Sequence, residues 1–296
     1  MKPGTTQRFV GYAMAATAAI LFGLNGNFSR LLFDRGISPI TLVEFRMLIG
    51  GLCLLTVLLI GKRSALKLPT RYWGWGVAFG LTLALVTFTY FVAISRLPLA
   101  IALVIQFSAP AWMALGEAVW RRKLPSGPVI FAVCLTFGGV ILLTGIWQER
   151  LNNLDRLGIL FAFLALLTYI AYLLIGRRVG YHLPALTATT YGALVASIFW
   201  FVVQPPWAVP ATTWQPGNIL LILLVGTLGM AIPFSLVLAA LRRIDATRVG
   251  IVGMLELVSA SVIGYFWLGQ MLTLWQIVGC TLVLIGVIIL QYEQQR

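Results

Sequence analysis

The chain has 296 residues, of which 60% are hydrophobic and 10% are charged, and its mean hydropathy is +0.97. Soluble globular domains carry about 25% charged residues, so this composition excludes a soluble domain and indicates an integral membrane protein. The formal net charge is +13, which in a soluble protein would favour a nucleic-acid partner. In a membrane protein the positions of the cations along the chain matter more than their sum.

Ten apolar segments follow one another with short polar breaks between them. They cover residues 9–33, 40–60, 72–95, 99–120, 127–146, 157–176, 184–204, 216–240, 247–268 and 273–291. A helix of roughly 20 residues crosses the hydrocarbon core of a bilayer, and in lipid the backbone amides must be bonded within their own segment. The sequence therefore predicts an all-α integral membrane protein with ten transmembrane helices. The apolar stretch before the first small-residue run is too short for a signal peptide, so we expect the first segment to be retained as a span.

The cations fall mainly on one side of the membrane when the spans are counted from a cytoplasmic N-terminus. The segments then expected in the cytoplasm hold Lys2, Arg8, Lys62, Arg63, Lys67, Arg71, Arg121, Arg122, Lys123, Arg177, Arg178, Arg242, Arg243, Arg248 and Arg296. The outer segments hold Arg30, Arg35, Arg96, Arg150 and Arg156. By the positive-inside rule this predicts that the N-terminus and the C-terminus are both cytoplasmic. The basic charge then reports orientation in the bilayer, and no nucleic-acid partner is expected.

The two halves of the chain are similar to each other. A shift of 147 residues places Gly11 over Gly158, Arg96 over Arg243, Trp120 over Trp267 and Gly139-Val140-Ile141 over Gly286-Val287-Ile288. This predicts two repeats of five helices, residues 9–146 and 157–291. Because five spans is an odd number, the second repeat must enter the membrane from the opposite side. Inverted repeats of this kind are typical of transporters that work by alternating access around a site between the halves.

Several short motifs resemble those of the drug/metabolite transporter superfamily, EamA type. They are Ala109-Pro110-Ala111 and Gly138-Gly139-Val140 in the first half, and Leu255-Glu256-Leu257-Val258, Leu268-Gly269-Gln270-Met271-Leu272-Thr273 and Gly286-Val287 in the second. The chain departs from the family pattern at Leu257, where the family usually has Pro, and at Gln270, where it usually has Glu. The resemblance implies two inverted five-helix repeats, a multi-pass location in the cell (inner) membrane, and export of amino acids, other metabolites or toxic compounds.

Two ionisable residues inside predicted spans are the first candidates for a site. Glu256 lies near the middle of the ninth span and Arg46 lies in the second. A charged side chain near the centre of a membrane helix costs about 2.5–3.5 kcal/mol, so it should face a cavity or a partner. Glu256 is predicted to bind a cationic or amine-bearing solute or to carry a coupling proton, and the alternative is a structural hydrogen bond to a neighbouring helix. For Arg46 three interpretations remain: a contact with a solute carboxylate, a structural partner across the bundle, or a side chain that snorkels outward to the interface.

Neutral polar side chains within the spans supply further candidates for substrate binding. Asn25 and Asn27, beside Gly23 and Gly26, are expected to break the first span, and Gln106 and Ser108, beside Pro110, the fourth. Such breaks often line a cavity, although the same groups also join helices by hydrogen bonds. Aromatic side chains at a similar depth would form its wall: Trp112, Tyr169 and Tyr172.

The remaining functional classes fit less well. His182 is the single histidine and is expected in a cytoplasmic loop, and the spans carry no paired carboxylates, so no catalytic residue, no metal site and no enzyme activity are predicted. No cofactor is expected, since no phosphate-binding motif occurs and every lysine lies outside the spans. The predicted function is a secondary-active or facilitative transporter that exports a small organic metabolite or drug-like solute by alternating access at a midplane cavity.

Some alternatives stay open at this point. They are an uptake carrier of the same fold, a non-transport membrane protein and an intramembrane enzyme. The predicted partners are a small-molecule substrate and the lipid bilayer. The sequence does not decide between a monomer and a homodimer, and it names neither the solute nor the coupling ion.

Overall fold

The computed structural model describes residues 5–61, 63–66, 70–97, 99–122, 124–148, 154–269 and 271–293. These residues are almost entirely helical and include no β-strand. The α-helices are α1 (Thr5–Asp34), α2 (Pro39–Gly61), α3 (Trp73–Arg96), α4 (Leu99–Phe107), α5 (Ala109–Arg121), α6 (Gly127–Thr144), α7 (Arg156–His182), α8 (Ala185–Val203), α9 (Pro216–Gly226), α10 (Ile232–Leu241), α11 (Ala246–Gly253), α12 (Leu255–Leu268) and α13 (Leu274–Glu293). Short 3₁₀ turns cover Arg63–Leu66, Thr70–Tyr72, Ile146–Gln148, Pro206–Ala208 and Ala211–Trp214, and a π-helical segment covers Thr227–Ala231.

Within the described residues, ten helical stretches are long and apolar enough to cross a membrane. The predicted fold class, an all-α membrane protein with ten spans, is therefore confirmed. Because ten is an even number, both ends of the chain lie on the same side of the membrane. Which side that is remains a prediction. Some residues named in the sequence predictions lie outside the described residues. They are the cations Lys2, Lys62, Lys67, Lys123, Arg150 and Arg296, and Gln270 of the motif at residues 268–273.

The first span differs from the sequence prediction. We expected a break at Asn25 and Asn27, but α1 is one continuous helix. The side-chain amide of Asn27 donates to the carbonyl of Gly23 in its own helix at 3.0 Å and to the carbonyl of Ala260 at 3.2 Å. The predicted break is wrong because this amide joins α1 to α12 and leaves the helical ladder intact.

The sixth span is longer than predicted. Helix α7 continues past residue 176 to His182, which therefore lies in the helix and not in a loop. Its buried face continues through Val179, and Arg177 forms an ion pair with Asp245. The ring of His182 stacks on Tyr72 with 5.2 Å between centroids. These contacts extend the helix beyond the expected end of the apolar segment.

Three of the ten spans are interrupted. The fourth divides at Ser108 into α4 and α5, which confirms the break predicted at Pro110, and the ninth divides at Met254 into α11 and α12. Pro110 fits the first turn of α5, where a helix needs no amide hydrogen. The eighth span was not expected to be interrupted, yet the π-helical segment Thr227–Ala231 separates α9 from α10.

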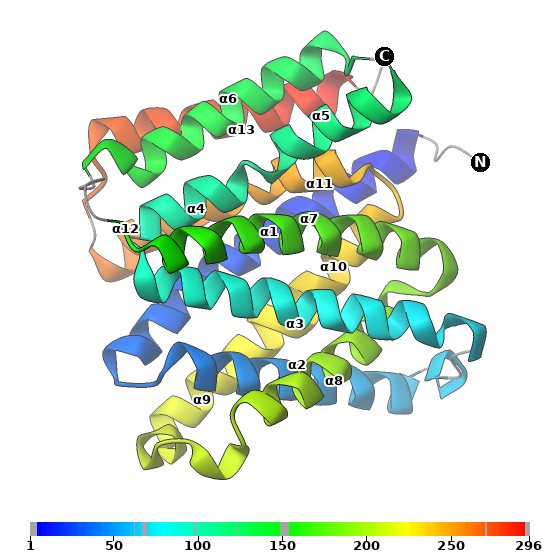
Figure 1. Ribbon diagram of the computed structural model, residues 1–296, viewed down its shortest axis with the longest axis vertical. Coiled ribbons are helices and arrows are strands. Elements are labelled where there is room, and N and C mark those ends of the chain that lie inside the picture. The colour runs from blue at the N-terminus through cyan, green and yellow to red at the C-terminus, as the bar shows by residue number, and fades with distance from the viewer. Residues whose placement is uncertain are drawn as a thin grey trace.

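The helices pack in pairs that follow one another along the long axis of the molecule, and the helices themselves run across this axis (Figure 1). Helix α2 packs along α8 at one end, α3 packs along α7 in the middle, and α6 packs along α13 at the other end. Helix α1 crosses the bundle and contacts both α10 and α12, while α7 contacts both α3 and α4. Residues from both halves of the sequence thus surround the centre of the bundle.

Two glycine contacts recur at the interval found in the sequence. A Cβ atom at Gly11 would lie 2.9 Å from the Cβ of Arg243, and one at Gly158 would lie 3.0 Å from the Cβ of Arg96. Both pairs of residues are related by the same shift of 147 positions. At each place only a glycine lets the helix approach its neighbour this closely.

Candidate solute-binding cavity

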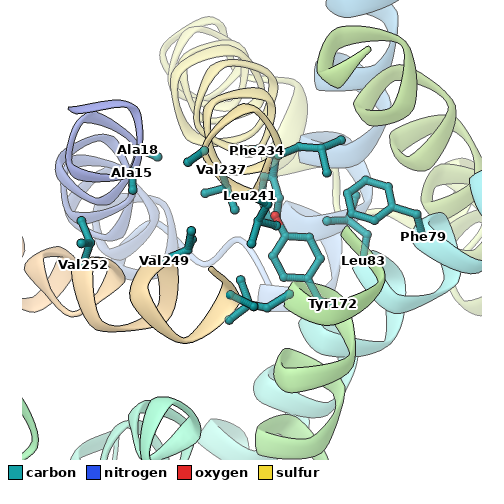
Figure 2. Close-up of a cluster of buried hydrophobic side chains, with 14 of the residues drawn as sticks. Ala15, Ala18, Phe79, Leu83, Tyr172, Phe234, Val237, Leu241, Val249 and Val252 are labelled. Atoms are coloured by element: carbon teal, nitrogen blue, oxygen red, sulfur yellow. The ribbon is translucent and has the colours of Figure 1, made fainter. Parts of the chain in front are cut away.

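A cavity of about 140 Å³ lies in the centre of the bundle. A single buried water needs only ~10–15 Å³ by this kind of measure, so the space is large enough for a small solute. Its lining comes from α1, α2, α3, α4, α7, α10, α11 and α12. Figure 2 shows part of the surrounding apolar cluster, in which Tyr172 of α7 lies beside Phe234 and Leu241 of α10, and Ala15 of α1 lies near Val249 of α11.

Arg46 is the cation of the cavity. Its Nη2 donates to the main-chain carbonyl of Gly229 at 3.0 Å, and its guanidinium carbon lies 5.5 Å from the centre of the Phe234 ring. Its Nε is buried without a hydrogen-bond partner in the described part of the chain. The guanidinium group is therefore held at one edge and retains hydrogen-bonding capacity for a ligand.

Glu256 is the anion of the same cavity. It lies in the first turn of α12, directly after the break at Met254. The amide groups at the start of a helix favour a negative charge at this place, so the break favours a carboxylate at this point of the ninth span. Across the described residues, no ion pair joins Glu256 to Arg46, although both line the cavity. Two opposite charges thus face one space without neutralising each other directly.

Two further polar groups of the lining lack hydrogen-bond partners among the described residues. The side-chain carbonyl of Gln106, just before the break at Ser108, and the hydroxyl of Tyr172 are both buried and unbonded. A buried polar group without a partner costs about 1–3 kcal/mol. A polar solute that bonded to these groups would recover part of this free energy.

Aromatic rings form much of the remaining wall. Tyr172 stacks on Tyr169 with 6.3 Å between ring centroids and meets Phe234 edge-on at 5.7 Å. Phe22 meets the same Phe234 ring edge-on at 5.0 Å. Faces of aromatic rings attract cations and pack against apolar groups. The wall therefore suits an ammonium group or a short hydrocarbon chain.

The structure brings some of the sequence-predicted site residues together and leaves others apart. The cavity lining includes Arg46, Gln106, Tyr169, Tyr172 and Glu256. It does not include the other four candidates.

Those four residues have different surroundings. Asn27 bonds to Gly23 and Ala260, and the hydroxyl of Ser108 bonds to the carbonyl of Ile105 within the broken span. Asn25 is buried, with its side-chain oxygen against the backbone of Gly229. Trp112 is 53% exposed on the outer surface of α5, where it would face lipid.

Sequence reasoning missed several lining residues. Among them are Phe22 of α1, Thr87, Tyr90 and Phe91 of α3, and Phe234 of α10. Phe234 follows Pro233, and a proline inside a span is the same signal that located the break at Pro110. The aromatic residues of α3 carry no such signal, because aromatic side chains are equally common on faces that contact lipid.

No group of three or more metal-binding side chains occurs in the part of the chain that the structure describes. What the cavity offers instead is one cation, one anion, unbonded amide and hydroxyl groups, and an aromatic wall.

The fold and the cavity define a multi-pass membrane protein with a central space for a small solute. The sequence model of the EamA-like transporter family matches residues 9–145 and again residues 156–292. The chain therefore belongs to the EamA-like transporter family, which confirms the resemblance seen in the sequence motifs.

Individual relatives agree with this assignment. The threonine/homoserine exporter RhtA of Salmonella typhimurium (strain LT2) is 31% identical over 198 residues, which are 66% of this chain and 63% of that protein. RhtA of Escherichia coli (strain K12) is 30% identical over 196 residues, again 63% of its length. The matched residues thus cover less than two thirds of the length of each RhtA protein. The uncharacterized transporter YwfM of Bacillus subtilis (strain 168) is 23% identical over 94% of this chain and 93% of its own.

A solved structure titled "Crystal structure of protein" has the same fold. Its TM-score is 0.79 over 97% of this chain and 98% of that one, with 18% sequence identity. At this identity the likeness shows the fold alone.

Proposed function

We propose that this protein is a secondary-active or facilitative transporter that exports a small zwitterionic metabolite, of the amino-acid class, by alternating access around the central cavity. The observation that carries the proposal is the placement of Arg46 and Glu256 in one cavity without a direct ion pair. An α-amino acid carries a carboxylate that would bind Arg46 and an ammonium that would bind Glu256. The relatives named threonine/homoserine exporters support this solute class and this direction.

The proposed alternating access is supported by the pairing of the helices. The contact of α1 with α10 and α11 of the second half corresponds, under the shift of 147 residues, to the contact of α7 with α3 and α4 of the first half. The family model also matches the chain twice, and the glycine contacts recur after 147 residues. Equivalent contacts between the two halves, arranged around one cavity, favour rocking of the halves about a shared site.

The energy source has two alternatives. The solute gradient could drive transport alone, or a proton could be exchanged for the solute at Glu256, which is our candidate coupling residue. An imposed pH gradient across proteoliposomes separates the two. If the rate does not respond to that gradient, the proton-coupled version is wrong.

The central experiment measures counterflow of radiolabelled L-threonine and L-homoserine in proteoliposomes, with analogues as competitors. Threoninamide lacks the carboxylate and N-acetylthreonine lacks the ammonium. We expect wild type to prefer threonine over both. Arg46→Gln should lose the preference over threoninamide, and Glu256→Gln should lose the preference over N-acetylthreonine, because each variant removes the partner of the missing group.

The matched control is Glu44→Gln. Glu44 is a second carboxylate within a span, 1% exposed, and it does not line the cavity. We expect its preferences to match those of the wild type. The proposal fails if neither amino acid is transported, or if Glu256→Gln keeps the wild-type preferences. Measurement of solutes outside intact cells decides between export and the alternative of uptake.

A further inference from the structure

The interruption of the eighth span has a specific chemical consequence. In an α-helix the amide of residue 233 would donate to the carbonyl of residue 229. Residue 233 is a proline and has no amide hydrogen. The carbonyl of Gly229 therefore cannot receive the α-helical bond from residue 233, and it accepts a hydrogen bond from Nη2 of Arg46 at 3.0 Å.

The interruption is a packed feature and not a frayed end. The π-helical segment Thr227–Ala231 is closed by a bond from the amide of Ile232 to the carbonyl of Thr227. Gly229 packs directly on Asn25, so closely that a Cβ atom at this position would lie 2.0 Å from the side-chain oxygen of Asn25. Met230 is fully buried against Gly50 of α2. An unpaired carbonyl in such surroundings would be costly, because water cannot easily reach it.

We propose that the hydrogen bond from Arg46 to Gly229, here called the latch, replaces the missing bond of Pro233 and holds the interruption of the eighth span in its present form. Arg46 is then a positioning residue for α9 and α10 as well as a cavity cation. This role was not suggested by the sequence, in which Arg46 and Pro233 are far apart.

The latch links the cavity to α10, a helix that the proposed alternating access would require to move. Phe234, the residue after Pro233, lies under the guanidinium group and in the cavity wall. A solute carboxylate that draws Arg46 toward the cavity would weaken the latch and free the interruption to change its angle. This last step rests on the proposed function. The latch itself exists without a solute and is tested without one.

The test is amide hydrogen exchange, measured by mass spectrometry on the ligand-free protein in lipid nanodiscs. In Arg46→Leu we expect exchange in peptides that cover residues 226–235 to be about tenfold faster than in wild type, because a hydrogen bond to a charged donor is lost. Arg46→Lys keeps a cationic donor and should restore most of the protection. Thr87→Val is the control in the same cavity, since the Thr87 hydroxyl bonds to Leu83 within α3 and does not touch the interruption.

A second variant makes the test specific. Pro233→Ala restores an amide hydrogen that can bond to the freed carbonyl. We expect the double variant Arg46→Leu, Pro233→Ala to return to within about twofold of the wild-type exchange rate in residues 226–235. A general loss of packing at Arg46 would not be repaired in this way.

The outcomes separate the latch from the transport proposal. Unchanged exchange in Arg46→Leu, or equally fast exchange with and without Pro233→Ala, would overturn the latch. Rescue by Pro233→Ala establishes it, whether or not threonine is transported. If the latch holds and neither threonine nor homoserine moves in the counterflow assay, the proposed solute class is at fault and the latch is not.

Discussion

The third and eighth spans occupy equivalent places under the shift of 147 residues, yet they differ in structure. Helix α3 is continuous, whereas the eighth span is divided into α9, a π-helical segment and α10. At the positions of Gly229 and Pro233 the third span has Thr82 and Val86. The hydroxyl of Thr82 bonds within its own helix, to the carbonyl of Phe79. Among the many differences between the two spans, the proline at position 233 is the one that removes a backbone donor from the interrupted helix.

The same contrast applies to the charges of the cavity. Arg46 lies in the second span, and its counterpart helix α8 has no charged residue. Glu256 lies in the ninth span, and the equivalent position of the fourth is Ala109. Some glycine contacts of the backbone thus recur after 147 residues, while the charges of the cavity do not. The variants below test each side of this comparison, in order of decreasing expected effect.

The largest effect is expected when the cation of the cavity is removed. Arg46→Gln should lower the rate of amino-acid transport at low solute concentration about 100-fold, because a buried charge-assisted contact is lost. Arg46→Lys should lose less, since a point charge replaces a bidentate fork. Initial rates in proteoliposomes at matched protein levels measure this. A loss of less than about threefold in Arg46→Gln would mean that the asymmetric charges do not bind the solute.

Equal effects in both halves are expected where the packing is symmetric. A Cβ atom at Gly139 would lie 2.7 Å from the carbonyl oxygen of Gly279, and one at Gly286 would lie 3.1 Å from that of Ala132. We expect Gly139→Ala and Gly286→Ala each to destabilise the α6–α13 pair by about 1–3 kcal/mol.

The neighbouring Gly138 is the control for this pair, because a Cβ atom there meets nothing within 4 Å. Gly138→Ala should be neutral or slightly stabilising. Thermal unfolding in detergent, followed by size-exclusion chromatography, compares the three variants. If Gly138→Ala costs as much as the other two, close approach of α6 and α13 is not what these glycines provide.

A change in rate without a change in affinity is expected when the interruption of the eighth span is repaired. Pro233→Ala should reduce the maximal transport rate about tenfold while KM changes less than about threefold, because a continuous helix bends less readily. The counterpart Val86→Ala only shortens an apolar side chain and should change the maximal rate less than about threefold. A lower KM together with an unchanged maximal rate in Pro233→Ala would indicate that the interruption shapes the cavity and plays no part in its opening.

The smallest effect is expected at the surface, where the chain ahead of α7 is capped. Asp155 bonds to the amide of Leu157 and pairs with Arg96 at 2.8 Å. Its hydrogen bond from Arg96 holds the pKa of the Asp155 carboxyl below its usual range. A lowered pKa in the folded state gives stability that is complete above the unfolded pKa of about 3.9 and is lost as the pH falls through the folded pKa.

Asp155→Asn keeps a capping oxygen and removes the charge. We therefore expect a slightly lower melting temperature than wild type at pH 7 and a smaller difference near pH 3, with both proteins compared in the same detergent. A difference that stays constant between the two pH values would assign the effect to the cap and not to the charge. At this exposed position we expect the shift to be small at any pH.

The sequence predicts much of the fold because length and hydropathy are sufficient for it. A span must cover the hydrocarbon core, so its ends can be placed within a few residues. A proline inside a span, such as Pro110, indicates a break, and the same signal at Pro233 was overlooked. His182 shows the limit of this reasoning. Helix α7 continues past the apolar segment because side-chain contacts, and not the hydrocarbon core, stabilise its last turns.

The charged candidates had the clearest physical basis in the sequence, although the uncharged candidates Gln106, Tyr169 and Tyr172 also line the cavity. Glu256 and Arg46 could be placed in the cavity because a charge inside a span needs a polar environment. The neutral side chains of Asn27 and Ser108 form hydrogen bonds to backbone carbonyls. The sequence alone does not show these bonds. The contact of Arg46 with Gly229 depends on the packing of α2 against the π-helical segment, and neither residue predicts it alone.

Each half of the chain contributes one charge to the cavity, and this restricts the orientation in which a solute can bind. Two identical halves related by a twofold axis would present every cavity side chain in duplicate, and a solute could then bind in two opposite orientations. A single chain in which Arg46 belongs to one half and Glu256 to the other presents each charge once. The two charges therefore give the cavity a direction, from Arg46 in the first half of the chain to Glu256 in the second.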